Sequence, residues 1–208
     1  MRQTLNFCSG WRFTQADGEF SENSVNVADW QAVTLPHTWN AQDGQSVANY
    51  YRGRCWYRKF FEAPELQNGQ RAVLKFEAVE HIAEVFCNGQ LLGTHKGGYS
   101  TFFVDLTNSL IPGENVIAVC ADNKAEHIYP QAADFTFFGG IYRPVILLIL
   151  EENHFSLEKS GSDGIFITPK VDGSVRVEAF VTGGSLVAVS LLDRLGSPVA
   201  QGSAAPRE

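Results

Sequence analysis

Short runs of β-branched, aromatic and other apolar residues, separated by Gly, Asn, Asp and Pro, follow one another along most of this sequence. No window of about 11 residues or more keeps apolar residues at the i, i+3, i+4 and i+7 positions that an amphipathic helix requires. Many short strands with turn residues between them are typical of a sandwich or a barrel. We therefore predict an all-β fold.

The expected strands are residues 55–61, 71–79, 83–87, 90–93, 102–106, 116–121, 142–150, 165–168, 175–181 and 186–192. The Asn88-Gly89 pair separates two of these runs and predicts a type I′ hairpin turn, because both residues tolerate the positive φ of that turn. The run 142–150 is almost continuously apolar, as expected of a strand that is covered on both faces.

The chain of 208 residues is longer than the roughly 150 residues of an average domain. The polar stretch 158–164 reads as a linker, so we expect one domain at 1–155 and a second at 163–208. A complete sandwich normally needs about seven strands and roughly 100 residues. The second domain is therefore expected to stop partway.

Charge and cysteine content limit the partners and the compartment. The net charge of −7 argues against a nucleic-acid partner, which requires a basic surface, and against an anionic membrane surface. No apolar run approaches the roughly 20 residues of a membrane span, and the N-terminus shows no secretory signal. Cys8, Cys55, Cys87 and Cys120 form no Cys-x-x-Cys pair. We expect buried thiols in a reduced, cytoplasmic protein.

Several familiar chemistries lack their motifs. The five histidines never fall at zinc-ligand spacing, and the sequence contains neither a phosphate-binding glycine loop nor a Gly-x-Ser-x-Gly elbow. Glycoside hydrolysis needs two carboxylates that flank one bond. Glu77, Glu80 and Glu84 lie close together in sequence, but we expect them on polar strand faces. No catalytic residue is predicted.

The long stretch 122–140 lacks clear strand alternation, and it contains Asp134 and several phenylalanines. Loops longer than about 12–15 residues in a compact domain usually carry function or are disordered. Tyr50, Tyr51 and Phe138 lie beside charged or glycine-rich loop residues, where packing in the core and stacking on sugar rings are both open. Trp11, Trp30, Trp56 and most of the phenylalanines are expected in the core.

Six motifs occur in order: WQAVTLPHTWN at 30–40, YRGRCWYRK at 51–59, NGQLLGTHKGGY at 88–99, FVDLT at 103–107, GENVIAV at 113–119 and DFTFFGGIYR at 134–143. Together they resemble the N-terminal jelly-roll, or sugar-binding, domain of glycoside hydrolase family 2. The 134–143 segment looks most like the β-galactosidase branch, and residues 163–208 resemble the first half of the immunoglobulin-like second domain. The resemblance implies a jelly-roll β-sandwich followed by an incomplete immunoglobulin-like β-sandwich.

In that family both catalytic glutamates belong to a later (β/α)₈ barrel, the acid in an Asn-Glu pair. This sequence contains no Asn-Glu dipeptide and has no room for a barrel of roughly 250 residues. The resemblance therefore implies the non-catalytic N-terminal portion of a retaining enzyme, which supports the sugar subsite of a missing barrel. We expect the chain alone to be inactive and to hold no cofactor, with Na⁺ or Mg²⁺ confined to the parent enzyme.

The resemblance also implies roles for individual residues. Asp134 looks like the residue that contacts sugar hydroxyls and, in some members, a sodium ion; a carboxylate suits this role because it accepts strong hydrogen bonds. Asn49, Tyr51 and Arg52 occupy a loop that approaches the sugar in relatives, and Phe138 completes the predicted substrate-binding set. The implied partners are a β-linked galactoside or related saccharide and the barrel of the parent chain.

Several alternatives stay open. One alternative is a parent of the β-glucuronidase type. A second is that the chain is a stand-alone carbohydrate-binding module or lectin. A third is a structural domain whose open strand edges pair between chains. The parent is also expected to form a homo-oligomer. Arg143 is expected to anchor its loop by donating to backbone carbonyls.

Overall fold

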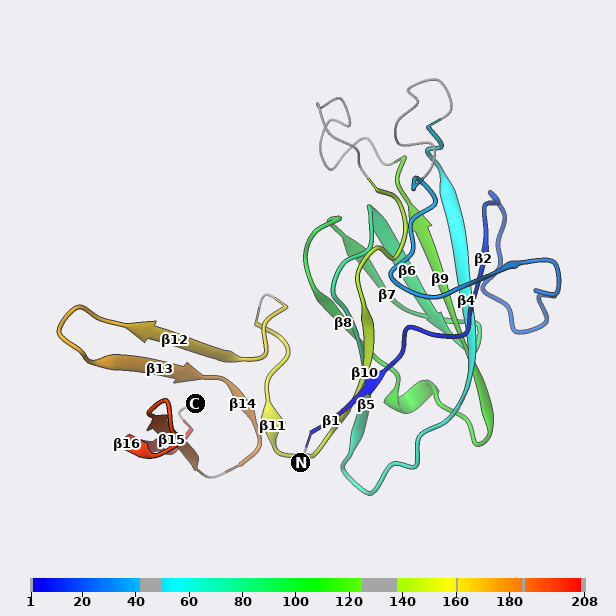
Figure 1. Ribbon diagram of the computed structural model, residues 1–208. Helices are drawn as coiled ribbons and strands as arrows, with labels where there is room; N and C mark the ends of the chain where they lie inside the picture. Colours follow the sequence, from blue (N-terminus) through cyan, green and yellow to red (C-terminus); the bar gives the residue numbers. More distant parts are fainter. Residues whose placement is uncertain (1, 42–49, 125–137, 160, 185, 207–208) are drawn as a thin grey trace. The chain divides into compact units, whose positions relative to one another are not determined.

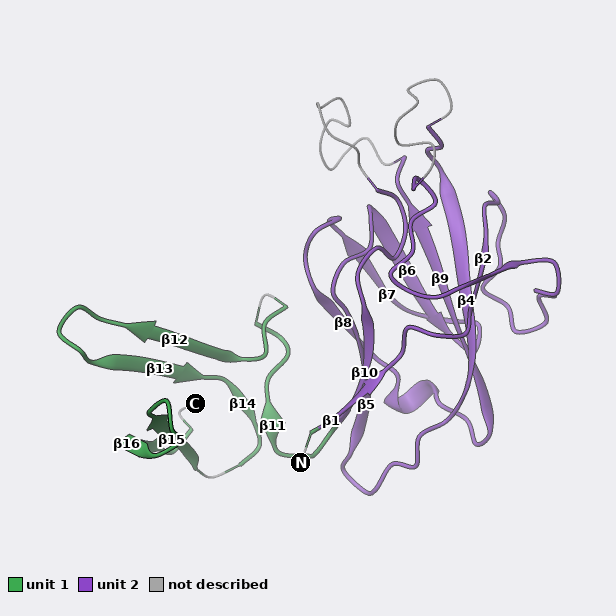
Figure 2. Cartoon of the chain, in the orientation of Figure 1, with its two compact units in different colours: residues 1–2, 150–208 green, residues 3–149 purple. Residues whose placement is uncertain are grey.

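The computed structural model describes residues 2–41, 50–124, 138–159, 161–184 and 186–206. Within these ranges every regular element is a β-strand except the short 3₁₀ helix η2 (Thr107–Ser109). No helix in the described part of the chain has the length and apolar character of a membrane span. The all-β prediction is confirmed. The chain divides into two compact units, residues 3–149 and residues 1–2 with 150–208 (Figure 2).

The larger unit is a sandwich of two antiparallel sheets (Figure 1). The six-stranded sheet has the order β3 (Gln31–Val33), β2 (Trp11–Thr14), β4 (Arg54–Glu62), β9 (Glu114–Asp122), β6 (Ile82–Cys87) and β7 (Gln90–Lys96). The four-stranded sheet has the order β1 (Gln3–Asn6), β10 (Val145–Leu150), β5 (Arg71–Phe76) and β8 (Phe102–Asp105).

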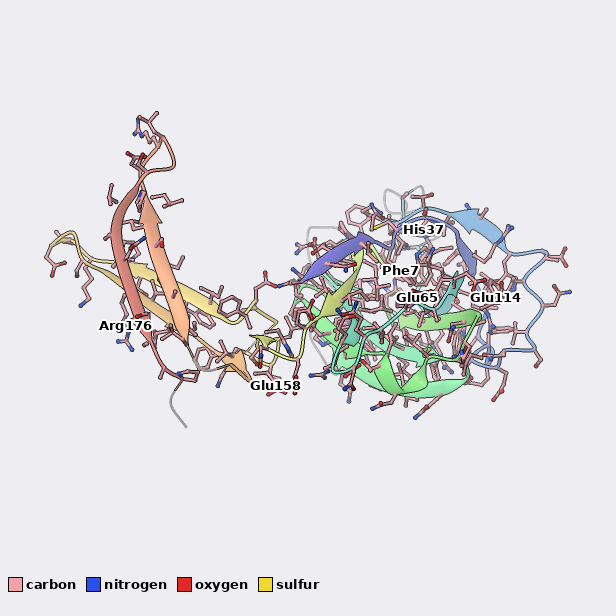
Figure 3. All side chains as sticks on the ribbon, turned by 90° about the horizontal axis from the view of Figure 1, so that it is seen from below. Phe7, His37, Glu65, Glu114, Glu158 and Arg176 are labelled. Atoms are coloured by element: carbon pink, nitrogen blue, oxygen red, sulfur yellow. The ribbon has the colours of Figure 1, made fainter. Side chains whose placement is uncertain are left out.

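The core lies between these two sheets, because alternate residues of each strand point to the same side. Tyr57 of β4 and Val119 of β9 are fully buried from one sheet, and Leu74 of β5 from the other. Phe7 and His37 lie among the crowded side chains of the sandwich (Figure 3). Each large apolar side chain buried in this way contributes about 1.5–3 kcal/mol.

The outer face of the six-stranded sheet carries a second, smaller cluster. Trp56 is fully buried there and packs with Phe20, Trp30 and Phe86. Arg58 is also fully buried, and its Nη1 donates to the carbonyl oxygens of Phe20 and Glu22 at 2.7 Å each. The segment around residues 18–30 therefore covers this face, held by one buried guanidinium and a cluster of rings.

The sequence predicted the central strands and missed the short ones. β1, β2 and β3, with three or four residues each, were not predicted; β8 is equally short, but its consecutive apolar residues were recognised as a strand. The Asn88-Gly89 hairpin is confirmed: both residues have positive φ, 50° and 83°. Trp11 lies in the main core as predicted, whereas Trp56 is fully buried in the cluster on the outer face and Trp30 is only partly buried beside it. All four cysteines are buried free thiols, as predicted.

The smaller unit consists of three antiparallel pairs: β11 (His154–Phe155) with β14 (Val181–Thr182), β12 (Ile165–Pro169) with β13 (Val175–Ala179), and β15 (Val187–Leu192) with β16 (Pro198–Ala204). β16 was not predicted from its small residues. On β12 and β13 one face is apolar, and Ile167 there is 66% exposed. The other face carries Thr168, Arg176 and Glu178 beside Phe166, and the Nη2 of Arg176 lies 2.8 Å from the Oε1 of Glu178.

Candidate functional site

Four connecting segments meet at one end of the sandwich, where β4 begins and β9 ends (Figure 1). These are residues 37–40, 50–53, 123–124 and 138–142. Hydrogen bonds join these segments to one another, and we take this end as the candidate site. Tyr51, Arg52 and Phe138 of the predicted binding set belong to these segments.

Two buried asparagines join the segments. Asn40 and Asn123 are 0% and 1% exposed, and the Nδ2 of Asn123 lies 3.4 Å from the Oδ1 of Asn40. Both Nδ2 groups also donate to the carbonyl of Tyr51, at 3.2 and 3.3 Å. The Oδ1 atoms accept from the backbone N–H of Gly139 and of Gly53, each at 2.8 Å. The two side-chain amides thus bind the backbone of segments 50–53 and 138–142.

The Gly139-Gly140 pair lets the chain approach the aromatic core closely. A Cβ at Gly139 would lie 2.2 Å from Trp39 and 2.7 Å from the Nδ2 of Asn123, and one at Gly140 would lie 2.4 Å from the Tyr57 hydroxyl. Gly140 also has a φ of 114°, which L side chains rarely adopt. Two glycines are therefore required for this contact.

Beneath the glycines, the Nδ1 of His37 and the hydroxyl of Tyr57 share a hydrogen bond of 2.8 Å. Burial lowers the pKa of His37 and raises the pKa of Tyr57 well above its usual value. Both groups are consequently neutral near pH 7, and this pair serves as a polar contact inside the sandwich.

The expectation that Glu80 lies on a polar strand face was wrong. Glu80 and the adjacent His81 are 1% and 0% exposed. The backbone of Glu80 exchanges two hydrogen bonds with Gly140, at 2.9 and 3.2 Å. Its Oε1 lies 3.9 Å from the Nδ1 of His81. Strand alternation does not continue past β5, so no periodic pattern indicates burial at residues 80 and 81.

The predicted binding residues differ in what they offer to a ligand. The hydroxyl of Tyr51 donates to the carbonyl of Arg54 at 3.2 Å. The guanidinium of Arg52 is exposed and lies 5.2 Å from the centre of the Tyr50 ring, and Phe138 is 46% exposed. Arg52 and Phe138 are therefore two exposed residues at this end of the sandwich, one cationic and one aromatic. Asp134 and Asn49 lie outside the described residues.

Arg143 does not hold its loop in the predicted way. In the described part of the chain it donates no hydrogen bond to a backbone carbonyl, and its guanidinium lies 5.6 Å from the centre of the Tyr142 ring. The anchor is Tyr142, whose hydroxyl donates to the carbonyl of Gly98. Burial, the largest cause, raises the pKa of Tyr142 to about 12, which keeps this donor protonated.

Among the described residues no group of three or more His, Cys, Asp or Glu side chains is arranged to hold a metal ion. The predicted sodium contact falls on Asp134 and stays a prediction. Asn40 and Asn123 were missed as members of the site. Asn123 follows an apolar strand directly and begins the long loop, which is the one signal that marks it.

The fold and this site agree with a known domain. Residues 10–151 match the model for glycosyl hydrolases family 2, sugar binding domain. The chain belongs to this family, and the matched residues largely coincide with the larger unit, the sandwich.

Individual relatives carry two different enzyme names. A β-glucuronidase from Bacteroides fragilis is 35% identical over 89% of this chain, and a β-galactosidase from Thermoanaerobacter pseudethanolicus is 33% identical over 84%. The crystal structure of a β-glucuronidase from Bacteroides uniformis superposes with a TM-score of 0.86 at 31% identity, over 98% of this chain and 26% of that one. The chain spans only 29% and 24% of the two curated relatives.

Proposed function

We propose that the sandwich is the sugar-contacting N-terminal domain of a retaining family 2 glycosidase, and that it shapes part of the sugar subsite of a (β/α)₈ barrel in the parent protein. The observation that carries this proposal is the match of the family's sugar-binding domain to residues 10–151. The exposed Arg52 and Phe138 at one end of the sandwich support it, because saccharides bind through ring stacking and a few polar contacts.

For the branch, we propose a β-galactosidase parent, as the resemblance of residues 134–143 suggests. A β-glucuronidase parent is the second candidate, since that name is somewhat more frequent among the relatives. Asp134 is the proposed contact to sugar hydroxyls. In the parent enzyme, Asp134→Asn should raise KM or lower kcat for galactosides, and unchanged kinetics would remove Asp134 from the site.

Nuclear magnetic resonance titration of the chain with methyl β-galactoside and methyl β-glucuronide tests the sugar contact. We expect weak binding that shifts the amide signals of Tyr51, Arg52 and Phe138 and leaves those of Ile167 and Arg176 in the smaller unit unchanged. The glycoside that gives the larger shifts identifies the branch. Uniform or absent shifts at high ligand concentration contradict the proposal.

Two further measurements separate the alternatives. Millimolar or tighter binding by calorimetry supports a stand-alone lectin, because a domain that acts only beside its barrel should bind more weakly. The purified chain should hydrolyse neither nitrophenyl β-galactoside nor nitrophenyl β-glucuronide, and turnover by a pure sample would refute the non-catalytic role.

Two proposals concern the setting. The four buried, free cysteines support a reducing compartment, and we propose the cytoplasm. The exposed apolar side chains of β12 and β15, such as Ile167 and Leu191, support self-association of the parent or of the chain.

A further inference from the structure

We propose that Asn40 and Asn123 act as one coupled amide unit that positions the four segments at the candidate site. One consequence rests on the proposed function: if Arg52 and Phe138 contact a saccharide, that contact should depend on this unit. The positioning itself is a property of the described residues and can be tested without a ligand.

The first argument is the shared acceptor. The carbonyl of Tyr51 accepts hydrogen bonds from the Nδ2 of both asparagines, and the indole Nε1 of Trp39 donates to it at 3.4 Å. A carbonyl oxygen has only two lone pairs, so these donors fix its orientation jointly. Tyr51 directly precedes Arg52, and the direction of the Tyr51 peptide therefore sets where Arg52 begins.

The second argument is the reach of the two Oδ1 atoms. Asn40 accepts from the N–H of Gly139, next to Phe138, whereas Asn123 accepts from the N–H of Gly53, next to Arg52. Each asparagine thus holds the backbone beside one predicted binding residue. Because the two amides also contact each other, a change in one should reach the backbone bond of the other.

The sandwich contains a matched control at its opposite end. Asn115 is fully buried, accepts from the Nδ2 of Asn88 at 2.8 Å, and donates to two backbone carbonyls. Asn115 lies at the start of β9 and Asn123 follows its end. With about 3.4 Å per residue, the two ends of this strand are roughly 27 Å apart. Loss of either asparagine should cost comparable stability, but only Asn123 is near the candidate site.

The experiment measures amide hydrogen exchange in the wild-type chain and in the Asn40→Ala, Asn123→Ala and Asn115→Ala variants. In Asn40→Ala we expect exchange at Gly139 and also at Gly53 to become at least about tenfold faster. In Asn123→Ala, exchange at both amides should also become faster. Here Gly53 loses its direct partner, and Gly139 is affected through Asn40. In Asn115→Ala, exchange at Gly53 and Gly139 should be no faster than the loss of global stability in that variant explains.

The outcome at the remote amide decides the inference. If each variant releases only its own direct partner, the two asparagines act separately and the coupled unit is refuted. A similar release in Asn115→Ala would also refute it, because the effect would then follow stability alone. Such results leave the proposed function intact, since sugar binding is measured separately.

Titration with the two methyl glycosides adds the functional consequence. Asn40→Ala and Asn123→Ala should each reduce the ligand-induced shifts at Arg52 and Phe138 by about fivefold or more, while Asn115→Ala keeps them. Equal loss in all three variants contradicts a positioning role. If the wild-type chain shows no shifts, the proposed sugar contact fails, and hydrogen exchange still decides whether the asparagines are coupled.

Discussion

Gly139 occupies the tightest backbone position at the candidate site. A methyl group there would overlap Trp39 at 2.2 Å and crowd the amide of Asn123. We expect Gly139→Ala to lower the free energy of unfolding by about 1–3 kcal/mol, which is the usual cost of overpacking. Urea denaturation measures the change. Gly93→Ala is the control, because a Cβ at Gly93 meets nothing within 4 Å; equal stability of the two variants would contradict the contact.

His37 gives the sandwich a dependence on pH. Burial lowers its pKa below the unfolded value of about 6.5, so the unfolded chain takes up the proton first as pH falls. Stability is therefore complete above about pH 6.5 and declines below it. His95 acts in the same direction, because burial lowers its pKa as well.

Replacement of His37 isolates its share of this decline. His37→Gln keeps a polar partner for the hydroxyl of Tyr57 but cannot be protonated. The free energy of unfolding of this variant should fall less steeply than that of the wild type between pH 6.5 and 5, by less than about 1.4 kcal/mol per pH unit for one proton. Denaturation series at several pH values provide the comparison. Parallel curves would show that His37 has the same pKa in the folded and the unfolded chain, which contradicts a pKa lowered by burial.

Strands and hairpins differ in how much of them the sequence reveals. β4, β5, β6 and β9 are rich in apolar, aromatic or β-branched residues, so their positions could be predicted. β1 could not, because all four of its residues are exposed and its place depends on pairing with β10. The Asn88-Gly89 turn was predictable because its chemistry is local.

The candidate site is only partly visible in the sequence for the same reason. Loop position was enough to propose Tyr51 and Phe138, and the family resemblance added Arg52. The contact between Asn40 and Asn123 joins residues 83 positions apart, and amide bonds to backbone leave no spacing pattern. Burial of Glu80 likewise follows from its bridge to Gly140, which no local pattern indicates.

Arg58 connects a loop to the outer face of the six-stranded sheet. Its guanidinium is fully buried and bonds the carbonyls of Phe20 and Glu22. We expect Arg58→Met to detach this segment and to speed cleavage by a glutamate-specific protease at Glu19 and Glu22. Mass spectrometry of the fragments gives the rate.

Arg12 is the control for that experiment, because it pairs with Arg58 across β2 and β4 but is exposed and makes only a 3.5 Å bond to Trp30. Arg12→Met should be cleaved at the wild-type rate. If Arg58→Met is equally resistant, the aromatic cluster around Trp56 is sufficient to hold the segment.

At the scale of the whole molecule, stability is concentrated in one unit. All residues of the main core lie between Phe7 and Ile149, within the larger unit of residues 3–149. The smaller unit consists of two-stranded pairs with exposed apolar side chains such as Ile167 and Leu195. Isolated hairpins are marginally stable in water, so the larger unit should not need the smaller one in order to fold.

A chain truncated to residues 1–155 tests this division. We expect it to unfold in one cooperative transition, with a midpoint within about 4 °C of the full chain, which corresponds to a difference of less than roughly 1 kcal/mol for a domain of this size. Circular dichroism during heating measures the midpoint. The truncation also removes the exposed apolar faces of β12 and β15, so light scattering should show less self-association. A truncated chain that fails to fold would mean that residues 156–208 contribute to the stability of the sandwich.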